Sequence, residues 1–537
     1  MSRPDTLFAL PLAALLALLT ACGDDGGGSD TTTGGSRGQA EPLSKVLVVG
    51  LDGLEWRILR DLLEEDRVPH MRALMERGTW GKLATFIPTL SPVLWTTMAT
   101  GKLPQHHGIH NFLDKQGQVY TSGRRAVPAL WNLAHDHGLS SNVFGWWLTW
   151  PVEEVDGMMI SGTSSGAMVN ANWKPALLPD APRQVHPPSL ETEVLELVAG
   201  LGTRERAEKV AAERVFGDIP PEDLGFVEKQ LLIPETMWSV QSDDTYAHLA
   251  LKYLAESPAD LNMVYFGGTD VSGHRFWRYY EPEIFDWPDK PEADRIAAEK
   301  LAPYFPGNSF KHLRELLATP AGDAMLAEVI ENYYAWMDDV LGQLLEAMGE
   351  DVTVLIVSDH GMHASATNLP NAGFITGHHQ DGAPGVIIAA GPGIKQQGDV
   401  EGFIATGAIG ARGSVLNVAP TVLTLLGIPV DEQMAKHGAY KPMLTEEALS
   451  LAAVPAVESY DLGFRRIDVT ERVSDAMNDA FKEKFQQLGY IGADGDVTFQ
   501  EAEVSELVNP DTFEPDTTFS VDDDPPPTSG GELDQDG

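Results

Sequence analysis

Three apolar runs in the sequence each end on an acidic residue, and two of the three also supply a histidine. The runs end at Asp52, at Asp270 with His274, and at Asp359 with His360. Short β-branched runs of this kind are typical of buried strands in a parallel sheet. In open α/β sheets, ligands bind beyond the carboxyl ends of the strands. The sequence therefore predicts that these side chains meet at one sheet edge, where carboxylates and imidazoles would bind metal ions.

Strand-like and helix-like segments alternate along the rest of the chain. The predicted strands are 45–50, 141–144, 158–161, 263–266, 352–357 and 386–390. Apolar positions recur with helical spacing over 58–77 and 324–348. This alternation predicts an α/β fold in which a mostly parallel central sheet is covered by helices on both faces.

The N-terminus reads as a targeting signal rather than as part of the fold. Arg3 precedes the apolar stretch 7–21, which is too short to span a membrane but suits a signal peptide. The stretch ends in Leu19-Thr20-Ala21-Cys22, which resembles a bacterial lipobox, and Cys22 is the single cysteine of the chain. The resemblance implies cleavage before Cys22 and lipidation of its thiol. We expect an exported protein, anchored by lipid to a bacterial membrane and facing the periplasm or the cell exterior. An incidental cysteine in a signal peptide is the alternative.

Composition divides the chain into five regions. We predict a signal peptide over 1–22, a flexible Gly/Ser/Thr tether over 23–41, a catalytic domain over 42–430, a helical extension over 431–500 and an acidic disordered tail over 501–537. Two stretches rich in Pro and Trp, about 166–260 and 275–323, are predicted to be cap insertions that roof the ligand-binding edge and select the substrate.

The net charge argues against nucleic acid as a partner. The chain has 79 acidic and 37 basic residues, which gives a formal charge of −42. Residues 501–537 contribute twelve acids without a Lys or Arg, and the remainder is still strongly acidic. Such a surface repels phosphate backbones and keeps a protein soluble.

Two further motifs complete an ordered set. Ser91 stands nine residues before Thr100-Gly101, and Gly377-His378-His379 follows the third acidic run. Together with the three strand ends, this order resembles the alkaline phosphatase superfamily, and in particular its type I phosphodiesterase/nucleotide pyrophosphatase branch. The resemblance covers roughly residues 46–428, including the segment 418–427. It implies an alkaline phosphatase-like fold and a hydrolase of phosphate esters.

The resemblance also assigns roles to the residues. It implies two divalent metal ions, most simply Zn²⁺ with Mn²⁺ or Fe as competitors. Ser91 would attack phosphorus and form a phosphoseryl enzyme, and Pro92 suits the first turn of a helix whose N–H groups would face the phosphoryl oxygens. The implied ligands of one ion are Asp52, Asp359, His360 and the Ser91 oxygen, and those of the other are Asp270, His274 and His379.

Simpler interpretations of single residues stay open. Asp52 alone could cap a helix, Asp270 and His274 could be a local hydrogen-bonded pair, and His378 could take the place of His379. Two other groups are expected to be structural. These are the histidines His106, His107 and His110, and the tryptophans Trp146, Trp147 and Trp150.

The residues after Ser91 separate the branches of the superfamily. Sulfatases resemble Cys/Ser-x-Pro-x-Arg, whereas this chain has Ser91-Pro92-Val93-Leu94-Trp95, which disfavours a sulfatase. Leu94 stands where phosphodiesterases often carry an Asn that contacts the phosphate, which argues against nucleotide pyrophosphatase activity more than against phosphoryl transfer. We expect an apolar wall of Leu94 and Trp95 toward the substrate.

The substrate is expected to be a phosphate ester of a small molecule, a glycan or a lipid head group. A transferase that moves a phospho-substituent onto a glycan or lipid is one alternative. A surface lipoprotein that has the fold without catalysis is another. The sequence does not indicate an oligomeric state.

Overall fold

A computed structural model describes most of the chain between residues 42 and 467. The described ranges are 42–162, 182–217, 232–284, 326–364, 375–409, 411–451 and 455–467, with the single positions Asn478, Asp479, Lys482 and Val508. All of them belong to one compact unit, Ala40–Gly537. The predicted signal peptide with Cys22, the tether, residues 285–323 and the acidic tail apart from Val508 lie outside the described residues.

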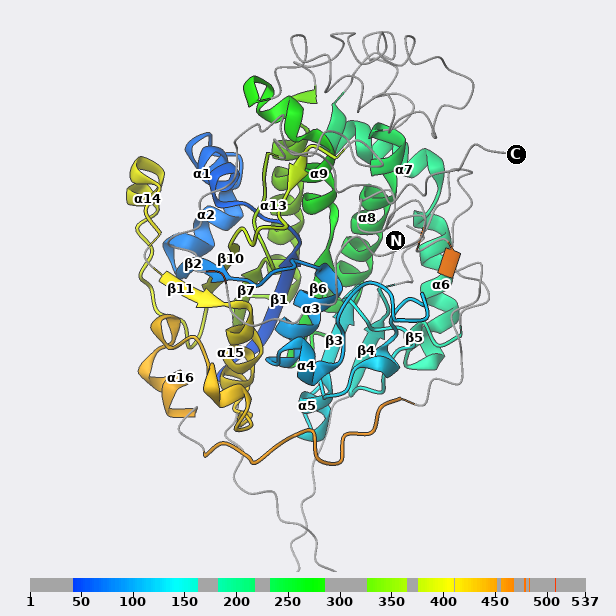
Figure 1. Ribbon diagram of the computed structural model, residues 1–537, viewed down its shortest axis with the longest axis vertical. Coiled ribbons are helices and arrows are strands. Elements are labelled where there is room, and N and C mark those ends of the chain that lie inside the picture. Colours follow the sequence, from blue (N-terminus) through cyan, green and yellow to red (C-terminus); the bar gives the residue numbers. More distant parts are fainter. Residues whose placement is uncertain are drawn as a thin grey trace, which may run out of the picture. The chain divides into compact units, whose positions relative to one another are not determined.

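Among the described residues, nine strands form one mixed sheet (Figure 1). Their order is β11-β2-β10-β7-β1-β6-β3-β4-β5. Strands β7, β1, β6, β3 and β4 run parallel, while β10 is antiparallel to both of its neighbours and β5 is antiparallel to β4. Their bounds are β1 Lys45–Leu51, β2 Thr79–Ala84, β3 Ser141–Phe144, β4 Gly157–Ile160, β5 Val185–His186, β6 Leu261–Phe266, β7 Val352–Val357, β10 Gly385–Ala390 and β11 Ala411–Ser414.

All six predicted strands are present, and the prediction of a mostly parallel α/β sheet is confirmed. Strands β2 and β11 were missed because their sequences, TWGKLA and ARGS, carry Gly and charged residues instead of a β-branched run. The two-residue strand β5 and the short hairpin of β8 (His363–Ala364) and β9 (Gly377–His378) were missed as well, because two-residue strands leave no periodicity to detect.

Helices cover both faces of the sheet (Figure 1). Alternate residues of β1 point to opposite cores: Leu47 and Val49 join one cluster, whereas Val46 and Val48 join the other. The first face carries α1 Trp56–Glu64, α2 Pro69–Glu76, α6 Glu191–Leu201, α7 Arg204–Ala211, α8 Ile233–Glu256, α9 Gly268–Tyr280, α13 Val329–Met348 and α14 Val400–Thr406. The second carries α3 Ser91–Thr100 with α4 Pro104–His107, α5 Leu130–Asp136, α15 Val418–Leu425 and α16 Glu446–Leu451.

Short turns of helix connect these elements. They are η1 Ser122–Arg124, η2 Pro188–Leu190, η3 Ala212–Phe216, η6 Pro282–Ile284, η7 Val415–Asn417, η8 Met434–Lys436 and η9 Lys441–Met443.

The predicted helix 58–77 is two helices. The chain breaks between α1 and α2, where Asp66 has a φ of 58° and Pro69 occupies the first turn of α2. Proline disfavours helical backbone in the residue before it, which accounts for the break. The apolar periodicity continues across the break, so the sequence pattern predicted a single helix.

The first predicted insertion does not simply roof the sheet edge. Its last third is the long helix α8, which packs directly against β3 and β6 and against α9 and α13. Helix α7 packs on α8 in turn, joined by an ion pair between Arg206 and Asp244. These helices therefore belong to the layer that covers one face of the sheet.

A buried lysine ties the segment after α15 to helix α3. Lys102, just after α3, is fully buried and donates to Asp431 at 2.6 Å and to Asp461. Of the predicted helical extension over 431–500, the structure describes α16 and short turns up to residue 467; beyond that residue, only Asn478, Asp479 and Lys482 are described. Within the described part of the chain, no helix has the length and apolar character needed to cross a membrane.

The buried lysine should contribute strongly to stability. Replacing Lys102 by Met would leave the Asp431 carboxylate buried without its cation, and we expect the free energy of unfolding to fall by about 3 kcal/mol. Denaturant unfolding measures this change. Lys252→Met is the control, because Lys252 pairs with Glu193 and Glu256 at the exposed surface and should have little effect. Equal stability of the two variants would contradict the assignment.

Candidate metal centre

Three adjacent strands deliver the acidic residues to one edge of the sheet. Strand β1 lies between β7 and β6 and pairs with both in parallel. Asp52 follows β1 directly, Asp359 is the second residue after β7, and Asp270 lies in the first turn of α9, which follows β6. Parallel strands end at the same edge, so these carboxylates, distant in sequence, become neighbours.

The first group of side chains consists of Asp52, Asp359 and His360. The Nε2 atom of His360 lies 3.3 Å from Oδ1 of Asp52 and 3.5 Å from Oδ2 of Asp359. All three side chains are buried. Their ligand atoms lie within 4.8 Å of one another, close enough to share one ion.

The second group consists of Asp270, His274 and His379. Oδ1 of Asp270 lies 3.3 Å from Nε2 of His274 and 3.6 Å from Nε2 of His379, and the two Nε2 atoms are 3.0 Å apart. His360 also belongs to this group, since its ring stacks on that of His379 with 3.7 Å between centroids. The two groups therefore adjoin and share His360.

The three imidazoles present the same nitrogen to the carboxylates. The Nδ1 atom of each is engaged behind the site: by the carbonyl of Gly361 for His360, by the carbonyl of Gly377 for His274 and by the hydroxyl of Thr89 for His379. Partners of this kind fix the tautomer and the ring orientation of metal-binding histidines. The Nε2 atoms are thus directed into the groups.

Close backbone contact permits one of these bonds. A Cβ on Gly273 would lie 2.2 Å from Sδ of Met362, and one on Gly377 would lie 2.2 Å from the carbonyl oxygen of Gly273. Because both positions lack a side chain, α9 and β9 approach closely enough for His274 to bond the Gly377 carbonyl at 2.9 Å.

Buried carboxylate oxygens without hydrogen-bond partners indicate a missing cation. Among the described residues, Oδ1 of Asp52, Oδ1 of Asp270 and both oxygens of Asp359 are buried and accept no hydrogen bond. Buried polar atoms normally have hydrogen-bond partners, and an ion-binding site is one standard reason for an exception.

The electrostatics support the same conclusion. Burial raises the pKa of Asp359 well above its ordinary value, and the nearby charge of Asp52 raises it further. Burial alone would lower the pKa of His360, but the carboxylates of Asp359 and Asp52 outweigh it and raise the pKa to about 10. The buried carboxylates therefore carry more negative charge than protonation of the neighbouring side chains would neutralise.

The spacing fits metal coordination. Ligand atoms about 2.0–2.2 Å from a tetrahedral Zn²⁺ lie about 3.3–3.6 Å from each other. The nitrogen–oxygen separations of 3.3–3.6 Å in both groups match this range. The donor set of imidazoles and carboxylates suits Zn²⁺, and the residues present therefore fit a pair of divalent ions.

The second oxygen of Asp52 is held from behind. Its Oδ2 accepts hydrogen bonds from Nε1 of Trp95 at 3.0 Å and from the hydroxyl of Tyr265 at 2.6 Å. The helix-cap interpretation of Asp52 is wrong, since the residue that caps α1 is Glu55. Asp52 is thus oriented with Oδ1 toward His360.

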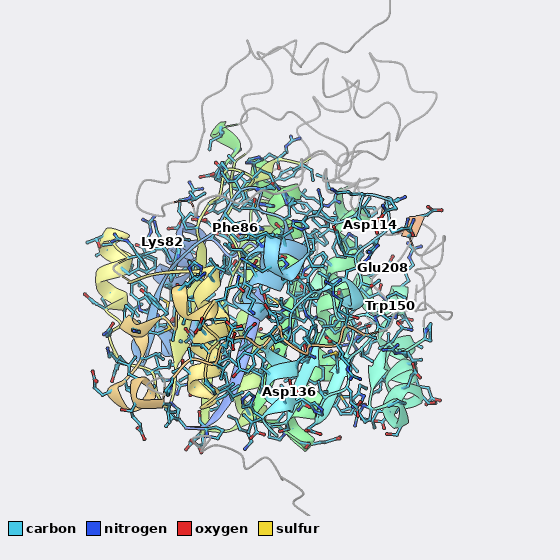
Figure 2. The ribbon with its side chains drawn as sticks, turned by 60° about the horizontal axis from the view of Figure 1, so that its bottom comes forward. Lys82, Phe86, Asp114, Asp136, Trp150 and Glu208 are labelled. Atoms are coloured by element: carbon cyan, nitrogen blue, oxygen red, sulfur yellow. The ribbon has the colours of Figure 1, made fainter. Side chains whose placement is uncertain are left out.

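Ser91 is the first residue of helix α3 and is 4% exposed. Thr89, two residues before it, bonds His379, and Trp95, one helical turn after it, bonds Asp52. Both groups of ligands therefore contact the short segment that carries Ser91. Lys82 of β2 and Phe86, both labelled in Figure 2, precede this segment in the chain, and Phe86 is buried in the hydrophobic core.

Two expectations about helix α3 are wrong. Leu94 and Trp95 are both fully buried, so they cannot form an apolar wall toward a substrate. The N–H groups of Val93 and Leu94 bond the carbonyl of Leu90, and Pro92 has none. Of the first helical positions, only the N–H of Ser91 itself is left to face a phosphoryl oxygen.

Other predicted residues fall where a structural role places them. His107 is buried and bonds Thr97 of α3, while His378 lies beside His363 and is not a member of the two groups. Trp146 is buried against Trp95, and Trp150, labelled in Figure 2, is also buried.

Several supporting residues were not anticipated from the sequence. Asp243 of α8 accepts from the N–H groups of Gly267 and Gly268 and from the hydroxyl of Tyr333, and so holds the start of α9 that carries Asp270. Thr89 and Tyr265 support His379 and Asp52. None lies in a motif; Thr89 alone had a signal, its position two residues before Ser91.

A comparison with protein families identifies the family of the chain. Residues 46–395 match the model of the family described as type I phosphodiesterase / nucleotide pyrophosphatase. The chain belongs to this family. A search of curated proteins found no match.

Solved structures give weaker similarities. A 2-O GAG sulfatase is 15% identical, with 78% of this chain and 76% of that chain covered and a TM-score of 0.39. An inactive murine ectonucleotide pyrophosphatase / phosphodiesterase 5 in complex with AMP is 13% identical, with coverages of 72% and 95% and a TM-score of 0.37. A phosphonoacetate hydrolase from Sinorhizobium meliloti is 15% identical, with coverages of 62% and 59% and a TM-score of 0.33.

The hydroxyl behind His379 should tune metal affinity. In Thr89→Ala, Nδ1 of His379 loses its partner, and we expect the affinity for Zn²⁺ to fall about 10–100-fold. Competition with a chromophoric chelator measures the affinity. Thr89→Ser is the matched control, because it retains the hydroxyl and should retain the affinity. Equal weakening in both variants would show that the effect comes from packing.

Proposed function

We propose that the protein is a metal-dependent phosphodiesterase-like hydrolase in which Ser91 is the nucleophile between two divalent ions. The observation that carries the proposal is the meeting of two adjoining ligand groups at the carboxyl edge of the sheet, with buried carboxylate oxygens that lack partners. Membership of the phosphodiesterase family supports the reaction class.

We assign the side chains to the two sets that the family resemblance implied, with His360 placed in the first. Asp52, Asp359 and His360 would hold one ion together with the oxygen of Ser91. Asp270, His274 and His379 would hold the other. Bound ions of this kind lower the pKa of a coordinated hydroxyl and stabilise charge on the attacking and leaving oxygens of an in-line displacement.

Ser91 would act first. Its Oγ forms a bond to phosphorus while the bond from phosphorus to the leaving alcohol oxygen breaks, which gives a phosphoseryl enzyme. Water then cleaves the bond between Oγ and phosphorus and releases the phosphate product. The N–H of Ser91 would face a phosphoryl oxygen during both steps, while Trp95 and Tyr265 keep Asp52 in place.

Phosphate is favoured over sulfate by the residues after the nucleophile. The fifth position of the sulfatase pattern is Arg, and here it is Trp95, whose indole is buried and committed to Asp52. Leu94, buried in the core, cannot contact a phosphate as an Asn would. We therefore propose a phosphate ester whose recognition does not depend on that amide.

Loss of the Ser91 hydroxyl should abolish activity. We expect Ser91→Ala to lower kcat/KM for bis-p-nitrophenyl phosphate at least about 1,000-fold in zinc-loaded protein, because no oxygen remains to attack phosphorus. Metal content should stay near that of the parent protein, since the histidines and carboxylates are unchanged.

Ser450→Ala serves as control, because this exposed hydroxyl bonds only within α16. Activity of Ser91→Ala equal to that of the control would refute the nucleophile. A panel of phosphate monoesters, diesters and sulfate esters, run with an added alcohol acceptor, separates a hydrolase from a sulfatase and from a transferase. No turnover of any ester by metal-loaded protein would favour a non-catalytic lipoprotein.

We further propose that the protein is lipid-anchored through Cys22 and works outside the cytoplasm. The support is the lipobox-like sequence before the single cysteine and the Gly/Ser/Thr-rich tether after it. In a bacterial host, the parent protein should take up labelled palmitate and sediment with membranes, whereas Cys22→Ser should do neither. Labelling of Cys22→Ser would contradict the anchor.

A further inference from the structure

A second set of metal-binding side chains lies on the hairpin that carries His379. His363 of β8 and His378 of β9 are directly opposite each other in the antiparallel pair. Asp381 follows three residues after His378. The ligand atoms of these three side chains lie within 4.8 Å of one another. None of them belongs to the two groups described above.

The orientation of His363 repeats that of the histidines in the main site. Its Nδ1 contacts the backbone carbonyl of Ala364 at 3.0 Å, while its Nε2 lies 2.8 Å from Oδ2 of Asp381. A backbone carbonyl on one ring nitrogen and a carboxylate beyond the other are also found at His360 and His274. The imidazole of His363 is therefore fixed with Nε2, the nitrogen that could bind a metal, directed toward Asp381.

The Asp381 carboxylate has unused capacity. Its Oδ1 is buried and accepts no hydrogen bond from the described residues. A purely structural hydrogen bond between His363 and Asp381 would use only Oδ2 of the carboxylate. Such a bond does not explain why Oδ1 is buried without a partner.

His378 supplies the third donor. Its ring centroid lies 5.5 Å from that of His363, across the hairpin. The position is partly exposed, and the side chain of Asp381 is 30% exposed, so water can occupy a fourth position. Two imidazoles, one carboxylate and a water are a ligand set that tetrahedral Zn²⁺ accepts.

We propose that His363, His378 and Asp381 bind a third divalent ion of the zinc type. The ion would join the two strands of the hairpin and the turn after them. His379 is the neighbour of His378, so the third ion would also hold the segment that delivers His379 to the main site. In this proposal His378 is a ligand of the third ion and does not replace His379 as a ligand in the main site.

Metal stoichiometry tests the proposal. The full-length protein is loaded with Zn²⁺, dialysed and measured by plasma mass spectrometry. We expect about three ions per chain in the parent protein and about two in His378→Ala and Asp381→Asn. His135→Ala is the matched control, because His135 pairs with Asp156 at an exposed site and should keep about three.

The same measurement keeps this proposal separate from the proposed function. Asp359→Asn removes a ligand of the main site, so a loss of zinc there reports on the catalytic pair alone. Circular dichroism identifies any variant that fails to fold, and His378→Gln then replaces His378→Ala. Zinc content equal to that of the parent in folded His378 and Asp381 variants would overturn the third site, whatever Asp359→Asn shows.

Hydrogen exchange gives a second readout. Zinc should slow exchange of the amides of β8 and β9 in the parent protein, and Asp381→Asn should lose this protection while that of β1 and β7 stays. Undiminished protection of the hairpin in Asp381→Asn would assign it to the main site and count against the third ion.

Discussion

Concentrated buried negative charge is the constraint on which this edge of the sheet depends. Asp52, Asp270 and Asp359 stand at the ends of three neighbouring strands, and each has at least one buried oxygen without a hydrogen bond. Burying one unpaired carboxylate is already costly, and three together repel one another. Cation binding would make the arrangement favourable, so the stability of this edge and the function proposed for it would have the same source.

The polar groups around the site orient its carboxylates and imidazoles through hydrogen bonds. Trp95 and Tyr265 fix the rear oxygen of Asp52, Thr89 and two backbone carbonyls fix the imidazoles, and Asp243 fixes the start of α9. None of these groups is needed to donate to an ion. They restrict the rotamers of the proposed metal ligands, so that less side-chain conformational entropy would be lost when an ion binds.

The sequence predicted what periodicity and motif order can carry. The six β-branched strands, the parallel core of the sheet and the start of α3 at Ser91 could all be predicted, because each leaves a local signal. Strands β2 and β11 could not, since their pairing with β10 and with each other comes from tertiary context. The wall of Leu94 and Trp95 failed because motif position says which residues neighbour the nucleophile but not which face of the helix is buried. The different environments of His378 and His379 could not be predicted, because they depend on a pair of two-residue strands that leaves no sequence pattern.

His360 belongs to both ligand groups, and its ring lies flat against that of His379. An imidazole so placed cannot rotate or shift toward one neighbour without disturbing the other. Exchange of one ion for a larger or differently coordinated one would therefore be transmitted to its partner position, and the pair would load and unload as a unit.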